Sequence, residues 1–203
     1  MVRIWCGALV TAVLVAAGSP ATAAEVGTPP PARDAPPPAL CRAAPRSLAE
    51  LNGLSATPAT VAAPAIPRPR DVVPQGRPAD PATVAGVTAT VRELVACFNA
   101  GELLRAYGLY TDPYLHRLLK RQDPMTLLAY DALATPMPEP PASSAAILAI
   151  RDVRLLPDGT AGATVTIQYA VVPMPKTFFI VFARAGGRWL IADILGEISF
   201  SVP

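Results

Sequence analysis

The distribution of proline constrains this chain more than any other feature of its sequence. Of the 203 residues 25 are proline, and 13 of these lie between Glu25 and Asp80. Because proline lacks a backbone N–H and fixes φ, this run cannot form a long helix or an inner β-strand. Its apolar residues show no sustained period, which favours an extended, polyproline-like linker. The sequence therefore predicts a linker over residues 25–80 and one folded domain over residues 81–203.

The first residues have the pattern of a secretory signal. A basic start at Arg3 precedes an apolar run over residues 4–18, and small residues follow at Ala21 and Ala23. The run is shorter than the roughly 20 residues that a membrane-spanning helix needs. We expect a cleaved signal peptide over residues 1–24, a secreted or cell-envelope protein, and no membrane attachment after cleavage. An uncleaved anchor is the alternative.

Secretion changes the chemistry expected of the cysteines. After cleavage Cys41 and Cys97 remain, and two thiols in an oxidising compartment can form one disulfide. Cys97 lies on the flank of an expected helix, about 120° from its apolar stripe at 100° per residue, where the preceding segment can reach it. We expect the bridge; the alternative is a buried Cys97 and an unpaired Cys41. No group of cysteines and histidines is present, so we expect neither a metal nor a cofactor.

One short island inside the linker has the signature of a helix. Ser47 and Glu50 have the spacing of a capping box, and Gly53 follows as a stop signal. We expect one or two helical turns over residues 47–53. The leucines of this island either dock on the main domain or belong to a transient turn.

Aspartate–proline pairs mark the starts of three expected helices. Aspartate is a favoured N-cap, and proline is favoured at the first helical position. The first such helix is expected over residues 81–99, where an Asn-Ala-Gly turn ends it. Its apolar stripe consists of Val84, Val87, Val91, Leu94, Val95 and Phe98. Shorter helices are expected over residues 102–110, 113–121 and 124–133.

The hydrophobic period changes to two after the helices. Alternating apolar and polar residues, separated by turn signals, predict antiparallel strands over residues 147–156, 163–172, 176–184 and 188–200. Helices followed by consecutive strands are typical of the α+β class. The sequence therefore predicts a curved antiparallel sheet with the N-terminal helices packed on one face.

Two motifs in this arrangement resemble those of a known superfamily. Asn99-Ala100-Gly101-Glu102 joins the first two helices of the domain, and Gly187-Arg188-Trp189 opens the last strand. With these motifs, residues 81–203 resemble the nuclear transport factor 2-like superfamily, which includes SnoaL-like and ketosteroid-isomerase-like proteins. The resemblance implies a cystatin-like cone, in which a bent sheet wraps around the helices and leaves a cavity. Members include isomerases, dehydratases, cyclases and binding modules, so the fold does not determine the function.

The resemblance also implies where a reaction would take place. Isomerase members use an apolar pocket with a carboxylate base and an oxyanion hole made by a tyrosine and an acid. Matched on the motifs, the tyrosine, base and acid positions fall near Leu94, Leu118 and Phe178, and none of these side chains can transfer a proton. The resemblance therefore implies an apolar ligand pocket. The expected lining residues are Leu94, Phe98, Tyr107, Tyr110, Tyr114, Leu118, Tyr169 and Phe178.

Two aspartates are the candidates for an acid or base. Asp193 alternates with apolar residues on its strand and could point into the cavity, where burial would raise its pKa; the alternative is a bulge or a solvated edge. Asp112 lies between Tyr110 and Tyr114, and the alternative is an N-cap. His116 lies among basic residues, and we expect it on a solvated helix face.

The formal charge of +2 gives no strong attraction to nucleic acid, and we expect no such partner. We expect an exported, non-catalytic domain that binds a small apolar molecule or, through its sheet, a partner or a second copy. The strand Thr-Phe-Phe-Ile-Val-Phe-Ala, apolar on both faces, fits a sheet that is covered on both sides. The alternative is an enzyme, an isomerase, dehydratase or cyclase-like lyase that uses a cavity carboxylate.

Overall fold

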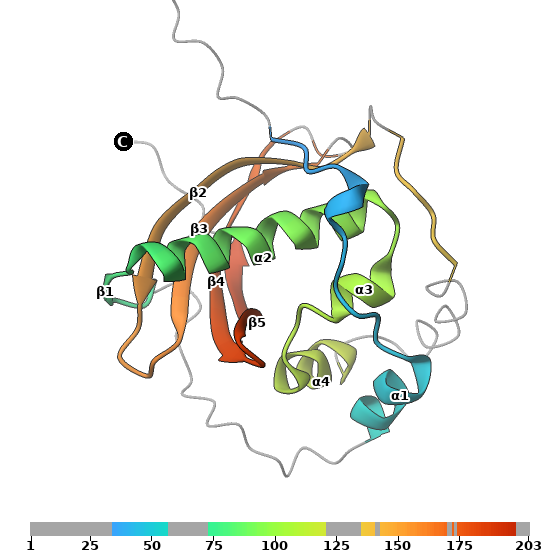
Figure 1. Ribbon diagram of the computed structural model, residues 1–203, viewed down its shortest axis with the longest axis horizontal. Helices are drawn as coiled ribbons and strands as arrows, with labels where there is room; N and C mark the ends of the chain where they lie inside the picture. The colour runs from blue at the N-terminus through green and yellow to red at the C-terminus, as the bar shows by residue number, and fades with distance from the viewer. Residues whose placement is uncertain are drawn as a thin grey trace, which may run out of the picture. The chain divides into compact units, whose positions relative to one another are not determined.

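A computed structural model describes residues 34–56, 73–120, 135–140, 143–169, 172 and 174–197. All of them belong to the second of two compact units, Pro31–Pro203. In this unit, helices pack with a five-stranded antiparallel open sheet (Figure 1), so the predicted α+β class is confirmed. The expected signal peptide and the expected helix over residues 124–133 lie outside the described residues.

The sheet has the strand order β1-β2-β3-β4-β5. Four of its strands lie within a few residues of the predicted ranges; the added strand, β1, comes just before the long helix over residues 81–99 and pairs with β2. β1 was not predicted because two residues, one of them proline, show no alternation. The strands are β1 (Arg77–Pro78), β2 (Ala146–Leu155), β3 (Ala161–Gln168), β4 (Lys176–Ala185) and β5 (Arg188–Glu197).

Bulges accompany the bend of the sheet around its helices, which Figure 1 shows as an arc of strands around α2 (Pro81–Asn99). The pairing of β2 with β3 shifts between Arg151 and Arg154, where Asp152 has a φ of 54°. Two further shifts occur between β4 and β5. A bulge increases the local twist and bends the strand that carries it, which lets a short sheet curve over a helix.

The helix α2 begins where the aspartate–proline signal predicts. The Asp80 carboxylate accepts hydrogen bonds from the N–H of Thr83 at 2.9 Å and from its hydroxyl at 2.8 Å. These bonds lower the pKa of the Asp80 carboxyl, with the backbone bond as the larger cause. Burial extends to Thr90, Ala96 and Cys97 outside the predicted stripe, whereas Val84 of that stripe is 37% exposed near the start of the helix. Another segment must therefore cover the side that faces away from the sheet.

That covering segment is formed by residues 34–56, which we call the strap. Figure 1 shows it crossing α2 near the C-terminal end of the helix and ending in α1 (Leu48–Ala56), which packs on α4 (Asp112–Lys120). Its Asp34 forms an ion pair with Arg92 and bridges to Ile147 of β2. Sequence reasoning placed these residues in a linker. Residues 34–56 instead pack on the domain, since Ala43 and Leu51 are almost inaccessible to solvent, in agreement with the docked alternative for the leucines of the helical island.

The predicted disulfide is confirmed. Cys41 of the strap is bonded to Cys97 of α2, across a sequence separation of 56 residues. The capping box in front of α1 also forms: the Glu50 carboxylate accepts the Ser47 N–H at 2.7 Å, and the Ser47 hydroxyl accepts the Glu50 N–H at 3.2 Å. The backbone bond is the larger cause of a lowered Glu50 pKa.

The Asn-Ala-Gly motif joins α2 to α3 (Leu103–Tyr107) and does more than turn the chain. Gly101 has a φ of 66°, which favours glycine. The buried Asn99 amide accepts the N–H of Ala145 at 2.8 Å and donates to the carbonyl of the same residue at 3.1 Å. It also donates to Pro36 of the strap at 3.4 Å. One side chain thus ties the helices to the start of β2 and to the strap.

Removing the disulfide should destabilise the protein. In the chain-entropy model, closing a loop of this length contributes roughly 4 kcal/mol. We expect Cys41→Ala/Cys97→Ala to lower the free energy of unfolding by a few kcal/mol, measured by denaturant unfolding under non-reducing conditions. Wild-type protein in reductant is the matched control and should show a similar loss. Equal midpoints for the variant and oxidised wild type would contradict the structural role of the bridge.

Truncating the buried Leu51 side chain distinguishes a strap that is packed on the domain from a linker that makes no stable contact with it. Leu51 is 0% exposed, so Leu51→Ala should lower the free energy of unfolding by roughly 2–5 kcal/mol. Met137 is 78% exposed, and Met137→Ala serves as a control that should change stability by less than about 0.5 kcal/mol. If Leu51→Ala is as mild as Met137→Ala in thermal or chemical unfolding, the strap is not part of the core.

Candidate functional site

Tyrosines gather where α3, α4 and the end of β3 meet. Tyr110 is stacked on Tyr114 with ring centroids 5.3 Å apart, and Tyr107 lies at 6.2 Å from Tyr110. Tyr110 is held in place by its backbone, which bridges to Ile191 of the edge strand β5. On the outer side, the Arg117 guanidinium lies 5.5 Å from the centre of the Tyr114 ring, a cation–π distance.

Tyr110 is the innermost member of this tyrosine cluster. Its side chain is 5% exposed. Burial raises the pKa of its phenol far above the ordinary value, and the neighbouring phenols of Tyr114, Tyr107 and Tyr169 raise that pKa further. Burial also raises the pKa of Tyr169, at the end of β3. Within the described residues, the Tyr110 hydroxyl makes no hydrogen bond, so it is a buried polar group whose bonding capacity is unused.

The other expected lining residues belong to the same apolar cluster as the tyrosines. Leu94 is buried, and Phe98, Leu118 and Phe178 are partly buried against the cluster. The large main core cluster includes all eight residues that the sequence analysis assigned to a pocket lining: Leu94, Phe98, Tyr107, Tyr110, Tyr114, Leu118, Tyr169 and Phe178. Five of them lie on α2, α3 and α4 and one on β4, while Tyr110 lies between α3 and α4 and Tyr169 directly follows β3.

The candidate carboxylates lie at the surface, not among these side chains. The Asp112 carboxylate is 2.5 Å from the Arg46 guanidinium, with 58% of the aspartate side chain exposed. Asp193 is 40% exposed and lies 3.5 Å from Arg117. It follows the bulge in β5 and accepts the N–H of Ile194, so it matches the bulge alternative of the sequence analysis. Both aspartates are therefore engaged by arginine at the rim.

His116 is placed differently from expectation. The sequence analysis put it on a solvated basic face, yet it is only partly exposed, and its Nδ1 lies 2.6 Å from the Leu54 carbonyl of α1. The reason is the docking of the strap, which covers this side of α4. His116 thus helps to hold α1 in place.

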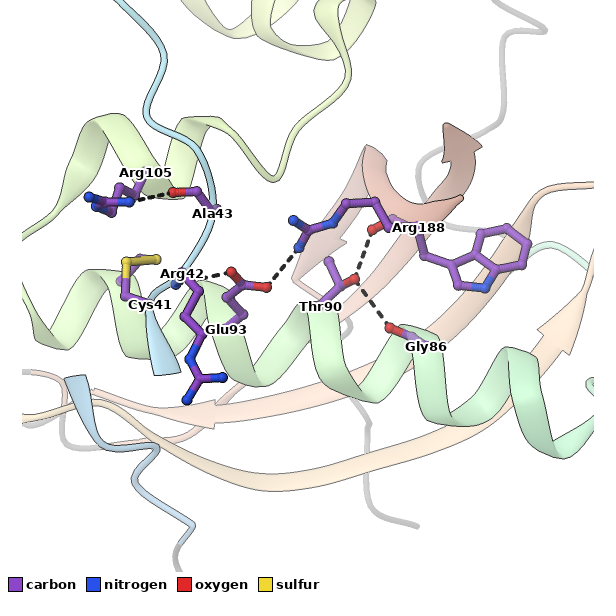
Figure 2. Close-up of polar contacts among 10 residues, drawn as sticks. Cys41, Arg42, Ala43, Gly86, Thr90, Glu93, Arg105 and Arg188 are labelled. Carbon is purple, nitrogen blue, oxygen red and sulfur yellow. Dashed lines mark hydrogen bonds and ion pairs between the residues drawn. A yellow bond between two sulfur atoms is a disulfide. The ribbon is translucent and has the colours of Figure 1, made fainter. Parts of the chain in front are cut away.

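An open groove that sequence reasoning missed lies between α2 and the hairpin of β4 and β5. It has a volume of about 540 Å³. Figure 2 shows its polar contacts: the Glu93 carboxylate accepts the N–H of Arg42 at 3.1 Å and the Arg188 guanidinium at 2.7 Å. The Thr90 hydroxyl donates to the Trp189 carbonyl at 2.7 Å. The lining residues are Asp80, Ala82, Thr83, Gly86, Ala89, Thr90, Glu93, Arg184, Gly187, Arg188 and Trp189.

The described parts of the chain contain no group of three or more histidine, cysteine or acidic residues that could hold a metal ion. Among these same residues, no helix is long and apolar enough to cross a membrane.

Comparison with known proteins gives no match: no family model, no curated protein and no solved structure is significantly similar to this chain.

The raised phenol pKa values predict sensitivity to alkali. An unfolded chain loses phenol protons near pH 10, whereas the folded protein keeps Tyr110 and Tyr169 protonated above that pH. Stability from this source is complete below about pH 10 and is lost as pH rises above it. We expect part of the tyrosinate absorbance to appear only with unfolding, and Tyr110→Phe to reduce the loss of stability above pH 10. Reversible ionisation of every tyrosine in folded protein near pH 10 would contradict this assignment.

Proposed function

We propose that this chain is an exported domain of the nuclear transport factor 2-like type, with a cystatin-like cone that binds a small, mainly apolar ligand. The order of helices before a curved antiparallel sheet supports this type of fold. The Cys41–Cys97 disulfide supports an oxidising, extracytoplasmic location, in agreement with the signal-like N-terminus. The ligand would bind against the tyrosine cluster.

The observation that carries the proposal is the Tyr110 hydroxyl. A hydroxyl buried without a hydrogen bond costs roughly 1–3 kcal/mol, and the Tyr110 ring packs beside Tyr107 and Tyr114 within the apolar cluster. A ligand with an apolar body and one hydrogen-bonding oxygen would recover this cost while burying its carbon atoms against Leu94, Phe98 and Phe178. Phenols suit such sites because the ring packs on apolar atoms while the hydroxyl fixes one polar group.

The positions of the ionisable side chains support a binding function better than a catalytic one. The positions where isomerase relatives keep their proton-transferring groups hold Leu94, Leu118 and Phe178, and all three belong to the apolar cluster. The candidates Asp112 and Asp193 are engaged by Arg46 and Arg117 at the surface.

Burial of the outer face of the sheet supports ligand binding as the function, in preference to formation of a homodimer through that face. Phe179 and Val181 of β4 point away from α2, as a dimer face would require. They are nevertheless 0% and 2% exposed, packed with Leu156, Leu195 and Val73 of the same chain. Apolar residues that are already buried offer little further area to a partner.

The proposal is tested with a fluorescent ketone and its parent hydrocarbon. A propionyl-substituted dimethylaminonaphthalene offers one carbonyl oxygen on an apolar ring, and dimethylaminonaphthalene lacks that oxygen. We expect Tyr110→Phe to weaken binding of the ketone about five- to tenfold, the loss of one neutral hydrogen bond, and to change binding of the hydrocarbon less than about twofold. Both affinities are measured by fluorescence titration.

Asp193→Asn is the control for the catalytic alternative. It should leave both affinities unchanged, because Asp193 lies at the rim. If neither probe binds saturably, or if Tyr110→Phe weakens both probes equally, the ligand does not use the Tyr110 hydroxyl and the proposal fails.

A further inference from the structure

We propose that the groove between α2 and the β4–β5 hairpin is a second, independent site that binds a small carboxylate or phosphate anion through Arg184, Arg188 and the indole N–H of Trp189. The groove lies apart from the tyrosine cluster, since its lining shares no residue with the eight expected pocket residues. The inference therefore does not depend on the function proposed above.

The groove has the size of a ligand site. Its volume of about 540 Å³ falls within the roughly 300–1,000 Å³ that is typical of pockets for small molecules. One wall is the face of α2 from Asp80 to Glu93, which spans about 20 Å at 1.5 Å per residue. The other wall is the hairpin, with Arg184 and Trp189 directly paired across the two strands. Paired residues place their side chains on the same face of a sheet, and both Arg184 and Trp189 line the groove.

Hydrogen-bond donors in this groove exceed the acceptors that the protein supplies. Arg184 is exposed and, within the described part of the chain, forms no ion pair or hydrogen bond. Arg188 bonds Glu93 through Nη2, and an arginine offers five N–H donors in all. The formal charges of the lining cancel, because Asp80 and Glu93 offset the two arginines. The unused donors, not the net charge, therefore select the ligand.

Trp189 adds a buried donor to this set. The residue is 8% exposed, and its Nε1–H has no acceptor among the residues that the structure describes. The indole lies tight against α2, because a Cβ on Gly86 would be 2.6 Å from Cδ1 and 3.2 Å from Nε1. Glycine at this position thus lets the indole approach the helix at the wall of the groove.

The acidic side chains of the groove are already occupied. Both Asp80 oxygens accept bonds from Thr83, and the two Glu93 oxygens accept bonds from Arg42 and Arg188. Glu93 is therefore a positioning residue, which holds Arg188 at the groove. A ligand rich in acceptors and poor in donors fits what remains, and the planar fork of arginine matches the oxygens of a carboxylate or phosphate.

The tryptophan itself reports on the site. The chain contains two tryptophans, so the full chain with Trp5→Phe keeps Trp189 as its only indole. The probes are glutarate, phenylacetate and inorganic phosphate, with the uncharged glutaramide as the matched neutral molecule. We expect at least one of the three anions to change Trp189 emission saturably and to raise the melting temperature, and glutaramide to do neither.

Matched arginine variants locate the response. Arg184→Gln should weaken anion binding about tenfold or more, as expected for the loss of a charge-assisted bond. Arg151→Gln, which removes an exposed arginine of β2 outside the groove, should change it less than about twofold. The proposal is overturned if no anion gives a saturable change, or if both variants respond like the parent chain. It is also overturned if sodium chloride at equal ionic strength reproduces the effect. The melting-temperature shift supplies an independent readout of each outcome.

Discussion

Burial of α2 from two sides is the interaction on which the rest of this structure depends. The bent sheet covers one side of the helix, and the strap covers the other through the Cys41–Cys97 bond and the Arg92–Asp34 ion pair. A helix of 19 residues buried in this way forms the centre of the domain, against which both sheet and smaller helices are ordered. The tyrosine cluster is carried by α3, α4 and the segment between them, which follow α2 in the chain, and residues 80–93 at the start and along the first part of α2 line the groove.

The edge of the sheet is protected by the same set of elements. Within the part of the chain that the structure describes, β5 has no strand neighbour on its outer side, and such an edge can pair with another chain. Here the Ile191 backbone is bonded by Leu109 and Thr111 instead. The Arg117 guanidinium donates to the Ala192 carbonyl at 2.9 Å, and Thr90 donates to that of Trp189. The segment that carries the tyrosines is thus fixed by the edge strand that it covers, which links the stability of the sheet to the geometry of the candidate site.

Local signals in the sequence predicted much of this fold. The Asp80-Pro81 pair located the start of α2, the alternation of apolar residues located four strands, and the capping box located α1. The disulfide was predictable because the expected signal cleavage would leave two cysteines, one of them on the flank of a predicted helix. Each helix start and strand is determined by residues that are close together in the sequence. The disulfide joins distant residues, but it involves a single expected pair of cysteines with no competing partner.

The remaining features depend on contacts between distant residues, which no local pattern encodes. The strap was assigned to a linker because its prolines suit an extended chain, with docking of its helical island left as an alternative. Both parts pack on the domain, since Ala43 is buried in the non-helical part and Leu51 is buried in α1. The groove depends on Gly86 meeting Trp189 across roughly a hundred residues of sequence, and Asn99 bonds to residues on both sides of it in the chain. Only Gly187-Arg188-Trp189 hinted at the groove, and it was interpreted as a structural motif.

Hydrogen exchange over the strap tests the central claim most directly. The N–H groups of Arg46 and Leu51 donate to the carbonyls of Leu104 and Ser47, so their exchange should be slowed to a degree comparable with the interior of α2 while the disulfide is intact. Reduction of Cys41–Cys97 should release the strap amides first and then lower protection in α2. Exchange of residues 34–56 at the rate of an unstructured chain, with α2 fully protected, would show that the helix does not need the strap and would contradict this account.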